Sequence, residues 1–117
     1  MEKIDFVFLI SVDTGWKEVF GHIRNLKETT NEAGKFAVVA IGTAILSCLK
    51  RTNKKTLQET ISALSKEGVE FFLCINTMNR YGVTEDLLLP EVKVATDGGL
   101  MRTAKLEAQG YHKFPIV

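Results

Sequence analysis

Continuous apolar runs restrict the fold of this chain more than any other feature of its sequence. Almost every side chain is apolar in residues 4–11, 36–41 and 69–74, which read IDFVFLIS, FAVVAI and VEFFLC. Strands of this kind are typical of a parallel sheet covered on both faces, whereas a half-exposed strand alternates apolar and polar residues. Shorter runs at 92–95 and 112–116 predict two more strands, and Pro115 places the last one at an edge or a strand end.

Helical spacing connects the first two of these strands. Apolar residues three and four positions apart predict a helix with one buried face, formed by Trp16, Val19, Phe20, Ile23 and Leu26. We expect this helix to run to about Ala33 and to end at Gly34, because glycine readily adopts the left-handed conformation that closes a helix. The side chain of Asp13 or Thr14 can accept hydrogen bonds from the free N–H groups at its start.

Further helices are predicted between the later strands. They cover residues 43–50, residues from about Asn53 to Gly68, one turn at 84–87, and a last helix from Asp97-Gly98-Gly99 to Gly110. Regular alternation of strand and helix predicts an α/β protein, a three-layer α/β/α sandwich around a mostly parallel five-stranded sheet. With 117 residues, the chain is expected to form a single domain over residues 1–117.

Composition and charge argue against several classes of function. The net charge is +1 and basic residues cluster only at Lys50, Arg51, Lys54 and Lys55, so we expect no nucleic-acid binding. No apolar run is long enough to cross a membrane, and acidic residues precede the first run, unlike in an export signal. Two cysteines in such a chain indicate a reducing compartment, and we expect a cytoplasmic protein. His22 and His112 lack the spacing of metal ligands and no phosphate-binding glycine motif occurs, so neither a metal nor a cofactor is expected.

Cys74 is the residue best placed for chemistry. It closes the third apolar run, at the carboxyl end of a buried strand, where open α/β sheets place ligands and reactive groups. The polar segment 76–82 follows and is predicted to be an exposed turn that contains Arg80. A nearby cation and a helix start favour the thiolate, which is the nucleophilic form of cysteine. The alternative is that Cys74, like Cys48 in the predicted helix at 43–50, is a small apolar core residue.

Several strand-to-helix junctions are expected to meet around Cys74, because parallel strands end at the same edge of a sheet. Each junction offers backbone N–H groups at a helix start, where an anion is stabilised. The predicted crevice brings together Cys74, Arg80, Asp13, Thr14, Gly42, Thr43, Asn76, Asp97 and Gly98. Taken singly, each junction is explained more simply by turn and cap residues that bind no ligand.

Three segments resemble the DsrE/DsrF-like family of small sulfur-relay proteins. Residues 74–83 (CINTMNRYGV) resemble the family's cysteine loop, 82–92 (GVTEDLLLPEV) its G-x-T-x-E-D-L-L-P-G-V stretch, and 110–113 (GYHK) its closing strand. The resemblance implies a five-stranded, mainly parallel sheet and assembly into trimers or hexamers. It also implies that Cys74 carries a persulfide and that Arg80 stabilises the thiolate or an anionic group of a partner. Residues 112–115 depart from the family pattern, which leaves the pairing of the last strand open.

Three hypotheses of function follow. The first is a sulfur carrier or sulfurtransferase subunit, which receives sulfur from a donor protein and passes it to an acceptor protein. The second is a non-catalytic oligomer whose crevice binds a small anionic metabolite or a nucleotide, and the third is a purely structural subunit. A homo-oligomer is expected because many large apolar residues occur in a small chain, namely Phe6, Phe8, Trp16, Phe20, Phe71 and Phe72.

Overall fold

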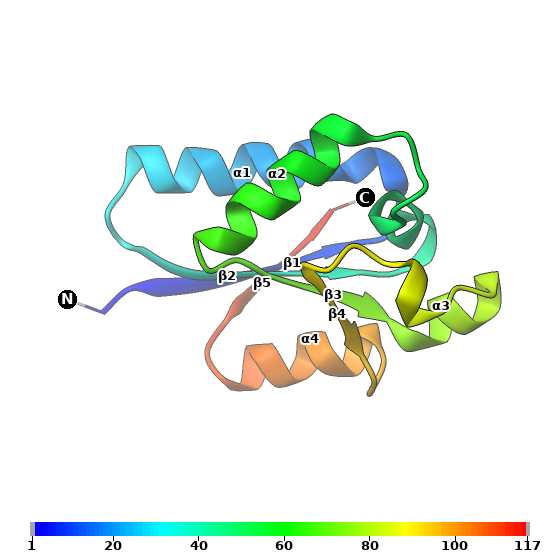
Figure 1. The fold of residues 1–117 in the computed structure, drawn as a ribbon. Coiled ribbons are helices and arrows are strands. Elements are labelled where there is room, and N and C mark those ends of the chain that lie inside the picture. The colour runs from blue at the N-terminus through cyan, green and yellow to red at the C-terminus, as the bar shows by residue number, and fades with distance from the viewer. Residues whose placement is uncertain (1, 117) are drawn as a thin grey trace.

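The computed structural model describes residues 2–116, which are built around one five-stranded sheet (Figure 1). The strands are β1 (Ile4–Ile10), β2 (Ala33–Ala40), β3 (Glu70–Cys74), β4 (Val92–Ala95) and β5 (His112–Ile116). Their order is β4-β3-β2-β1-β5, and every neighbouring pair is parallel. The chain therefore has the α/β fold with a parallel sheet that its apolar runs predict.

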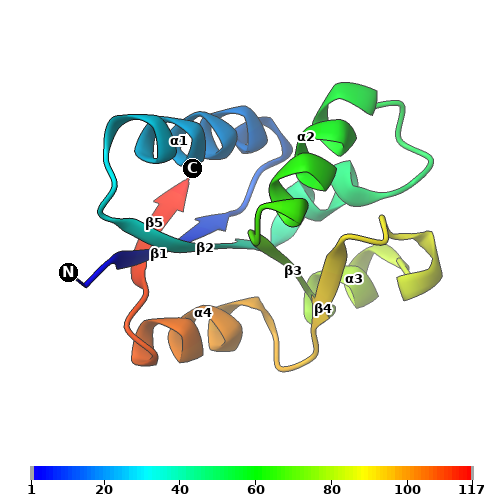
Figure 2. The same ribbon diagram turned by 60° about the vertical axis from the view of Figure 1, so that its left-hand side comes forward.

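Helices cover both faces of this sheet (Figures 1 and 2). α1 (Trp16–Thr29) and α2 (Lys55–Lys66) lie on one face, and α4 (Gly99–Ala108) lies on the other. α3 (Ile75–Tyr81) follows β3 directly. Short 3₁₀ segments form part of the connections, and these are η1 (Asp13–Gly15), η2 (Gly42–Cys48) and η3 (Glu85–Leu87). The arrangement is the predicted three-layer sandwich.

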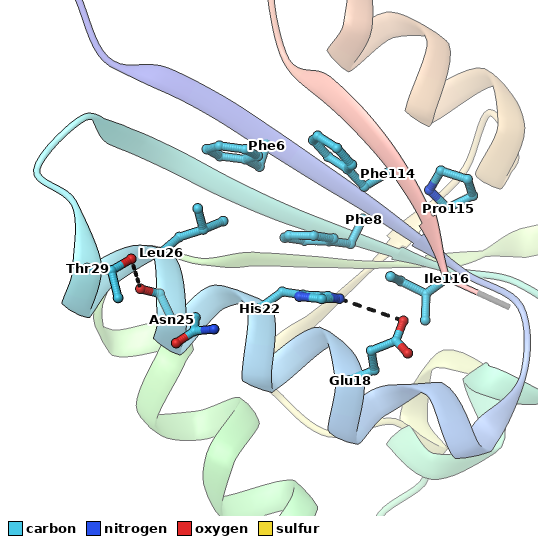
Figure 3. Close-up of a pocket in the computed structure, with 10 residues that line it drawn as sticks. All are labelled: Phe6, Phe8, Glu18, His22, Asn25, Leu26, Thr29, Phe114, Pro115 and Ile116. Atoms are coloured by element: carbon cyan, nitrogen blue, oxygen red, sulfur yellow. Dashed lines mark hydrogen bonds and ion pairs between the residues drawn. The ribbon is translucent and has the colours of Figure 1, made fainter.

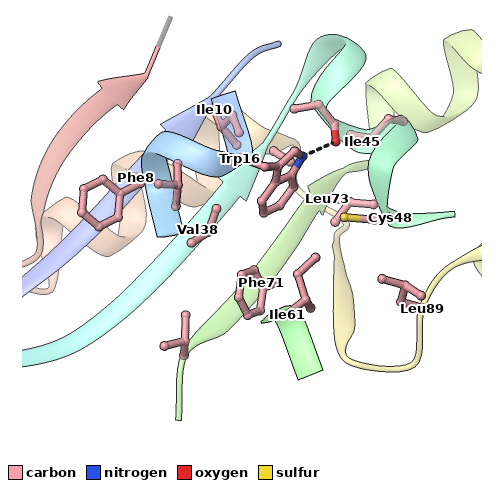
Figure 4. Close-up of a cluster of buried hydrophobic side chains, with 14 of the residues drawn as sticks. Phe8, Ile10, Trp16, Val38, Ile45, Cys48, Ile61, Phe71, Leu73 and Leu89 are labelled. Atoms are coloured by element: carbon pink, nitrogen blue, oxygen red, sulfur yellow. Dashed lines mark hydrogen bonds between the residues drawn. The ribbon is translucent and has the colours of Figure 1, made fainter. Parts of the chain in front are cut away.

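Two apolar cores explain why the strands carry apolar side chains on both faces. The larger core lies between the sheet and the α1–α2 layer and includes Phe8, Trp16, Ile45, Cys48, Ile61 and Phe71 (Figure 4). The smaller core lies on the α4 side and consists of Val7, Ala37, Val39, Phe72, Ala95, Leu106 and Tyr111. Because successive residues of a strand point to opposite faces, Phe71 and Phe72 enter different cores.

The first helix ends at Thr29 rather than at about Ala33. Ala33 instead pairs with Ile4 of β1 as the first residue of β2. Gly34 is not a helix cap either, because it lies within β2 beside Asp5, whose carboxylate accepts a hydrogen bond from the Lys35 N–H at 2.7 Å. A β-carbon at Gly34 would collide with this carboxylate. Glycine at this position therefore allows β2 to lie close to Asp5 of β1.

The start of α1 and the segment after Cys74 also differ from the predictions. Neither Asp13 nor Thr14 caps α1 through its side chain, because both residues belong to η1, which leads into the helix. The predicted turn at 76–82 is mostly the helix α3, which ends at Gly82 in the left-handed conformation (φ 67°). Met78 packs into the larger core, so burial of this residue stabilises a helix in an otherwise polar segment.

The last strand has a well-defined place. β5 pairs with β1 in unbroken register from Phe6–His112 to Ile10–Ile116. The pairing of the last strand, which the sequence of residues 112–115 leaves open, is therefore regular. No other strand within residues 2–116 pairs with the far side of β5. Pro115 therefore lies on an edge strand, as its missing N–H predicts.

The large apolar residues that suggested oligomerisation are mostly internal. Phe8, Trp16, Phe20, Phe71 and Phe72 are all buried within the chain and leave no surplus on one face. The exposed large apolar side chains are instead Ile4, Tyr81, Leu100, Met101 and Phe114. The large apolar side chains that are available to a partner surface are therefore a different set from the one that the sequence suggests.

Candidate active site around Cys74

A cavity of about 530 Å³ opens at the carboxyl edge of the sheet, where β3 and β4 end. Four separate junctions contribute to it, because the parallel strands end side by side (Figure 1). Its lining residues are Ser11, Ile41, Gly42, Cys74, Asn76, Thr77, Arg80, Asp97, Gly98, Leu100 and Met101. The sequence-based expectation that these junctions meet around a cysteine agrees with this geometry.

The Cys74 thiol lies in the wall of this cavity and is surrounded by hydrogen-bond donors. Burial leaves the residue 6% exposed and by itself raises the pKa of the thiol. Hydrogen bonds from the backbone N–H groups of Thr77, Gly99 and Asn76 and from the Thr77 hydroxyl stabilise the thiolate. These bonds outweigh the burial, so the pKa of Cys74 lies below its ordinary value. The surroundings therefore favour a nucleophilic sulfur.

Five of the other predicted site residues line the cavity with Cys74, and these are Gly42, Asn76, Arg80, Asp97 and Gly98. Asp13, Thr14 and Thr43 do not line it. They belong to η1 and η2, where the Asp13 N–H donates to the Thr43 hydroxyl at 3.2 Å. That contact joins the junction after β1 to the junction after β2.

The two charged residues that line the cavity, Asp97 and Arg80, differ in whether they form ion pairs. The Asp97 carboxylate lies 2.9 Å from Lys105 Nζ and 3.3 Å from Arg102 Nε. The hydrogen bond from Lys105 in particular lowers the pKa of Asp97, which is therefore an anion whose neighbours are cations of α4. Arg80 takes part in none of the ion pairs formed within residues 2–116. Arg80 is thus the cation at the cavity that is open to an anionic group.

No three His, Cys, Asp or Glu side chains within residues 2–116 lie close enough together to hold a metal ion. The helices of this part of the chain are all too short or too polar to cross a membrane.

A model of the DsrE/DsrF-like family matches residues 7–114 of the chain. The chain belongs to this family. Among solved structures it is similar to MTH1491 of Methanobacterium thermoautotrophicum, a protein of unknown function, with a TM-score of 0.85 and 23% identity over 97% of this chain and 99% of that one. It is also similar to YchN of E. coli, with a TM-score of 0.71 and 17% identity over 99% and 100% of the two chains. At such identities the likeness supports the fold alone. A search of curated protein sequences found no match.

Thr77 and Gly99, two donors to the thiol, are not among the site residues predicted from the sequence, although Gly99 belongs to the predicted Asp97-Gly98-Gly99 helix start. Thr77 donates to Cys74 from the first turn of α3, and its hydroxyl also accepts a hydrogen bond from the Gly42 N–H at 3.3 Å. Gly99 brings its N–H to the thiol at the start of α4. A helix prediction for 75–81, based on Gly82 as its closing glycine, would have placed Thr77 beside the cysteine.

The two cysteines of this DsrE/DsrF-like protein are expected to react at very different pH values. Cys74 has a lowered pKa, so its alkylation by iodoacetamide should reach half its maximal rate at a lower pH than the alkylation of a free cysteine thiol. Cys48 is fully buried in the larger core, and desolvation raises its pKa to about 12. It should stay unmodified until the protein is unfolded. Peptide mass spectrometry after alkylation across a pH series measures both, and equal labelling of the two thiols would contradict the assignment.

Proposed function

We propose that this protein is a sulfur carrier that holds a persulfide on Cys74 and passes it to an acceptor protein. The observation that supports this most is the thiol itself, which lines a cavity and is surrounded by donors that lower its pKa. Membership of the DsrE/DsrF-like family points in the same direction, since the family resemblance associates the matching cysteine with sulfur relay. Such a role suits a reducing, cytoplasmic setting, in which thiols are not consumed by disulfide formation.

The transfer requires little machinery beyond the thiolate. The Cys74 sulfur attacks the outer sulfur of a donor persulfide, a new S–S bond forms at Cys74, and the donor leaves as a thiolate. In the second half, an acceptor thiolate attacks the outer sulfur on Cys74, and Cys74 leaves as a thiolate. The donors from Thr77 and Gly99 stabilise the charge on Cys74 whenever it is the attacking or the leaving group. No net oxidation occurs, so no further reactant is needed.

The other residues of the cavity have proposed roles in this scheme. Arg80 attracts the anionic end of a donor or acceptor, because no carboxylate within the described chain neutralises it. Asn76 and Gly42 border the space in which the outer sulfur would lie, and Asp97 and Gly98 form the turn that leads to the Gly99 donor. Leu100 and Met101 are exposed at the same opening and offer apolar surface to a partner or to another copy in a homo-oligomer.

Incubation with glutathione persulfide, followed by intact mass measurement, tests the proposal. The wild-type protein should gain the mass of one sulfur atom, Cys74→Ser should gain none, and Cys48→Ser should load like the wild type. The Cys48→Ser variant is the matched control, because it removes a thiol that is buried away from the cavity. Equal loading of the two variants would remove the basis of the proposal.

The competing hypothesis, a non-catalytic site for a small anion or nucleotide, is favoured by two observations. The cavity volume of about 530 Å³ falls in the range of small-molecule sites, and Arg80 supplies a free positive charge. A thermal-shift screen of metabolites and nucleotides separates the two hypotheses, because a ligand that binds only the folded state raises its stability. A ligand that stabilises Cys74→Ser as strongly as the wild type, together with no sulfur loading, would favour this second function.

A further inference from the structure

A second cavity lies away from Cys74, between α1 and the edge strand β5 (Figure 3). Its volume is about 460 Å³, and it shares no lining residue with the cavity around Cys74. The lining residues are Phe6, Phe8, Glu18, His22, Asn25, Leu26, Thr29, Phe114, Pro115 and Ile116. We call this cavity the aromatic groove. All residues of β5 except Ile116 are exposed.

The sheet side of the aromatic groove is a surface of phenyl rings. Phe6 and Phe8 project from the same face of β1, and Phe114 stands beside Phe8 in the strand register. The Phe114 ring centroid lies 5.8 Å from that of Phe6 and 6.2 Å from that of Phe8. Phe114 is 46% exposed, whereas Phe8, its partner in the strand register, is 2% exposed. The groove therefore presents aromatic surface that the chain itself leaves uncovered.

The helix side of the aromatic groove carries four polar side chains in addition to Leu26 (Figure 3). Glu18, His22, Asn25 and Thr29 follow one another at helical spacing along one flank of α1. Glu18 is the only carboxylate among the lining residues, and no Lys or Arg lines the groove. The His22 ring stacks on Phe8 with 6.0 Å between ring centroids, and its Nε2 lies 3.7 Å from the Glu18 carboxylate. The groove thus combines aromatic faces on one side with a negative charge on the other.

We propose that the aromatic groove binds a small aromatic cation. The aromatic ring of the ligand packs against Phe6 and Phe114, and its positive group lies between the Phe114 ring and the Glu18 carboxylate. Cations are attracted both to the faces of aromatic rings and to a carboxylate, so the two sides of the groove select the same ligand. An anion is repelled by Glu18, and a neutral ring gains only the apolar contact. The volume of the groove is suited to a ligand of this size.

A second copy of the chain is a less suitable occupant. β5 is an edge strand that carries Pro115, which cannot donate a backbone hydrogen bond to an added strand. Continuation of the sheet across two copies is therefore disfavoured at this edge. The groove is also concave with its negative charge on one wall, a shape that suits an inserted small molecule.

Titration of the full-length protein with benzyltrimethylammonium, followed by amide NMR shifts, tests this proposal. Saturable binding is expected, with shifts concentrated in residues 18–29 and 112–116. Benzyl alcohol and phenylacetate, which have the same ring without the cation, should bind several-fold more weakly. Glu18→Gln should weaken binding of the cation by about fivefold, and Phe114→Ala by a similar factor. Both side chains are well exposed, so both variants should fold.

Glu28→Gln is the matched control, because Glu28 lies on the same helix but lines a different groove, between α1 and α2. It should bind the cation like the wild type, as should Cys74→Ser. Equal affinity for benzyl alcohol and for the cation, or no effect of Glu18→Gln, would overturn the proposal. It would also be overturned by a dimer in sedimentation that Phe114→Ala dissociates, because the groove would then be filled by a second copy.

Discussion

Gly99→Ala is expected to destabilise the protein by about 1–3 kcal/mol and to raise the pKa of the Cys74 thiol at the same time. A β-carbon at this position would collide with the Ile41 side chain and would lie 3.1 Å from Cys74 Cβ and 3.5 Å from its Sγ. Ile41 is branched at its β-carbon and cannot turn the contacting methyl away freely. The start of α4 must therefore move, and the Gly99 N–H moves away from the thiol with it.

Two measurements on the same variant separate these effects. Urea unfolding gives the change in the free energy of unfolding, and alkylation across a pH series gives the change in the thiol pKa. The control is Gly21→Ala, since a β-carbon at Gly21 meets no atom within 4 Å and the residue is inside α1. That variant should be more stable than the wild type by about 0.5–1 kcal/mol, and the pKa of its Cys74 thiol should be unchanged. A Gly99→Ala protein with a wild-type thiol pKa would show that the Gly99 N–H contributes little to activation.

Trp16→Ala is expected to have the largest effect on stability, a loss of about 3–5 kcal/mol. Trp16 is 1% exposed and packs against Phe20 and Phe71, with ring centroids 5.7 Å and 6.2 Å away. Its indole N–H donates to the Ala44 carbonyl at 2.9 Å, and this bond joins α1 to η2 (Figure 4). Removal of the ring leaves a void and an unpaired buried carbonyl. A loss of this size is a large part of the stability of a typical domain.

Trp16→Phe isolates the contribution of the hydrogen bond. Phenylalanine retains much of the apolar contact but leaves the Ala44 carbonyl without its donor, which should cost about 1–3 kcal/mol. Unfolding should be followed by circular dichroism, because Trp16 is the only tryptophan of the chain. The control Leu100→Ala changes an exposed residue and should shift stability by no more than about 0.5 kcal/mol. If Trp16→Phe were as stable as the wild type, the hydrogen bond would not hold the two segments together.

The sheet could be predicted from the sequence because its strands are apolar on both faces. This pattern is strong in β1, β2 and β3, and it requires a parallel sheet between two layers of helices. The start of β2 could not be predicted in the same way. Ala33 and Gly34 have no apolar pattern of their own, and their strand conformation comes from pairing with β1 and from the space that Asp5 occupies.

The site was only partly predictable for a related reason. The meeting of Gly42, Cys74 and Asp97 follows from a general property of parallel sheets, whatever their side chains. The hydrogen-bond donors to the thiol cannot be predicted from the spacing of apolar residues. Thr77 reaches the thiol because it lies in the first turn of α3, and Gly99 reaches it because a residue without a β-carbon fits against Ile41 and Cys74. Asp13 and Thr43 were expected at the cavity but contact each other. Two junctions at the same edge of a sheet can pack against each other instead of lining a ligand site.

The place of β1 between β2 and β5 has a consequence for biosynthesis. β1 is synthesised before the other four strands of this sheet, and one of its edges stays unpaired until residues 112–116 have been made. Until then a nascent chain exposes the rings of Phe6 and Phe8 together with a bare strand edge, which is a surface that chaperones bind and that promotes aggregation. Deletion of residues 112–116 should therefore reduce the soluble yield far more than the loss of five residues suggests.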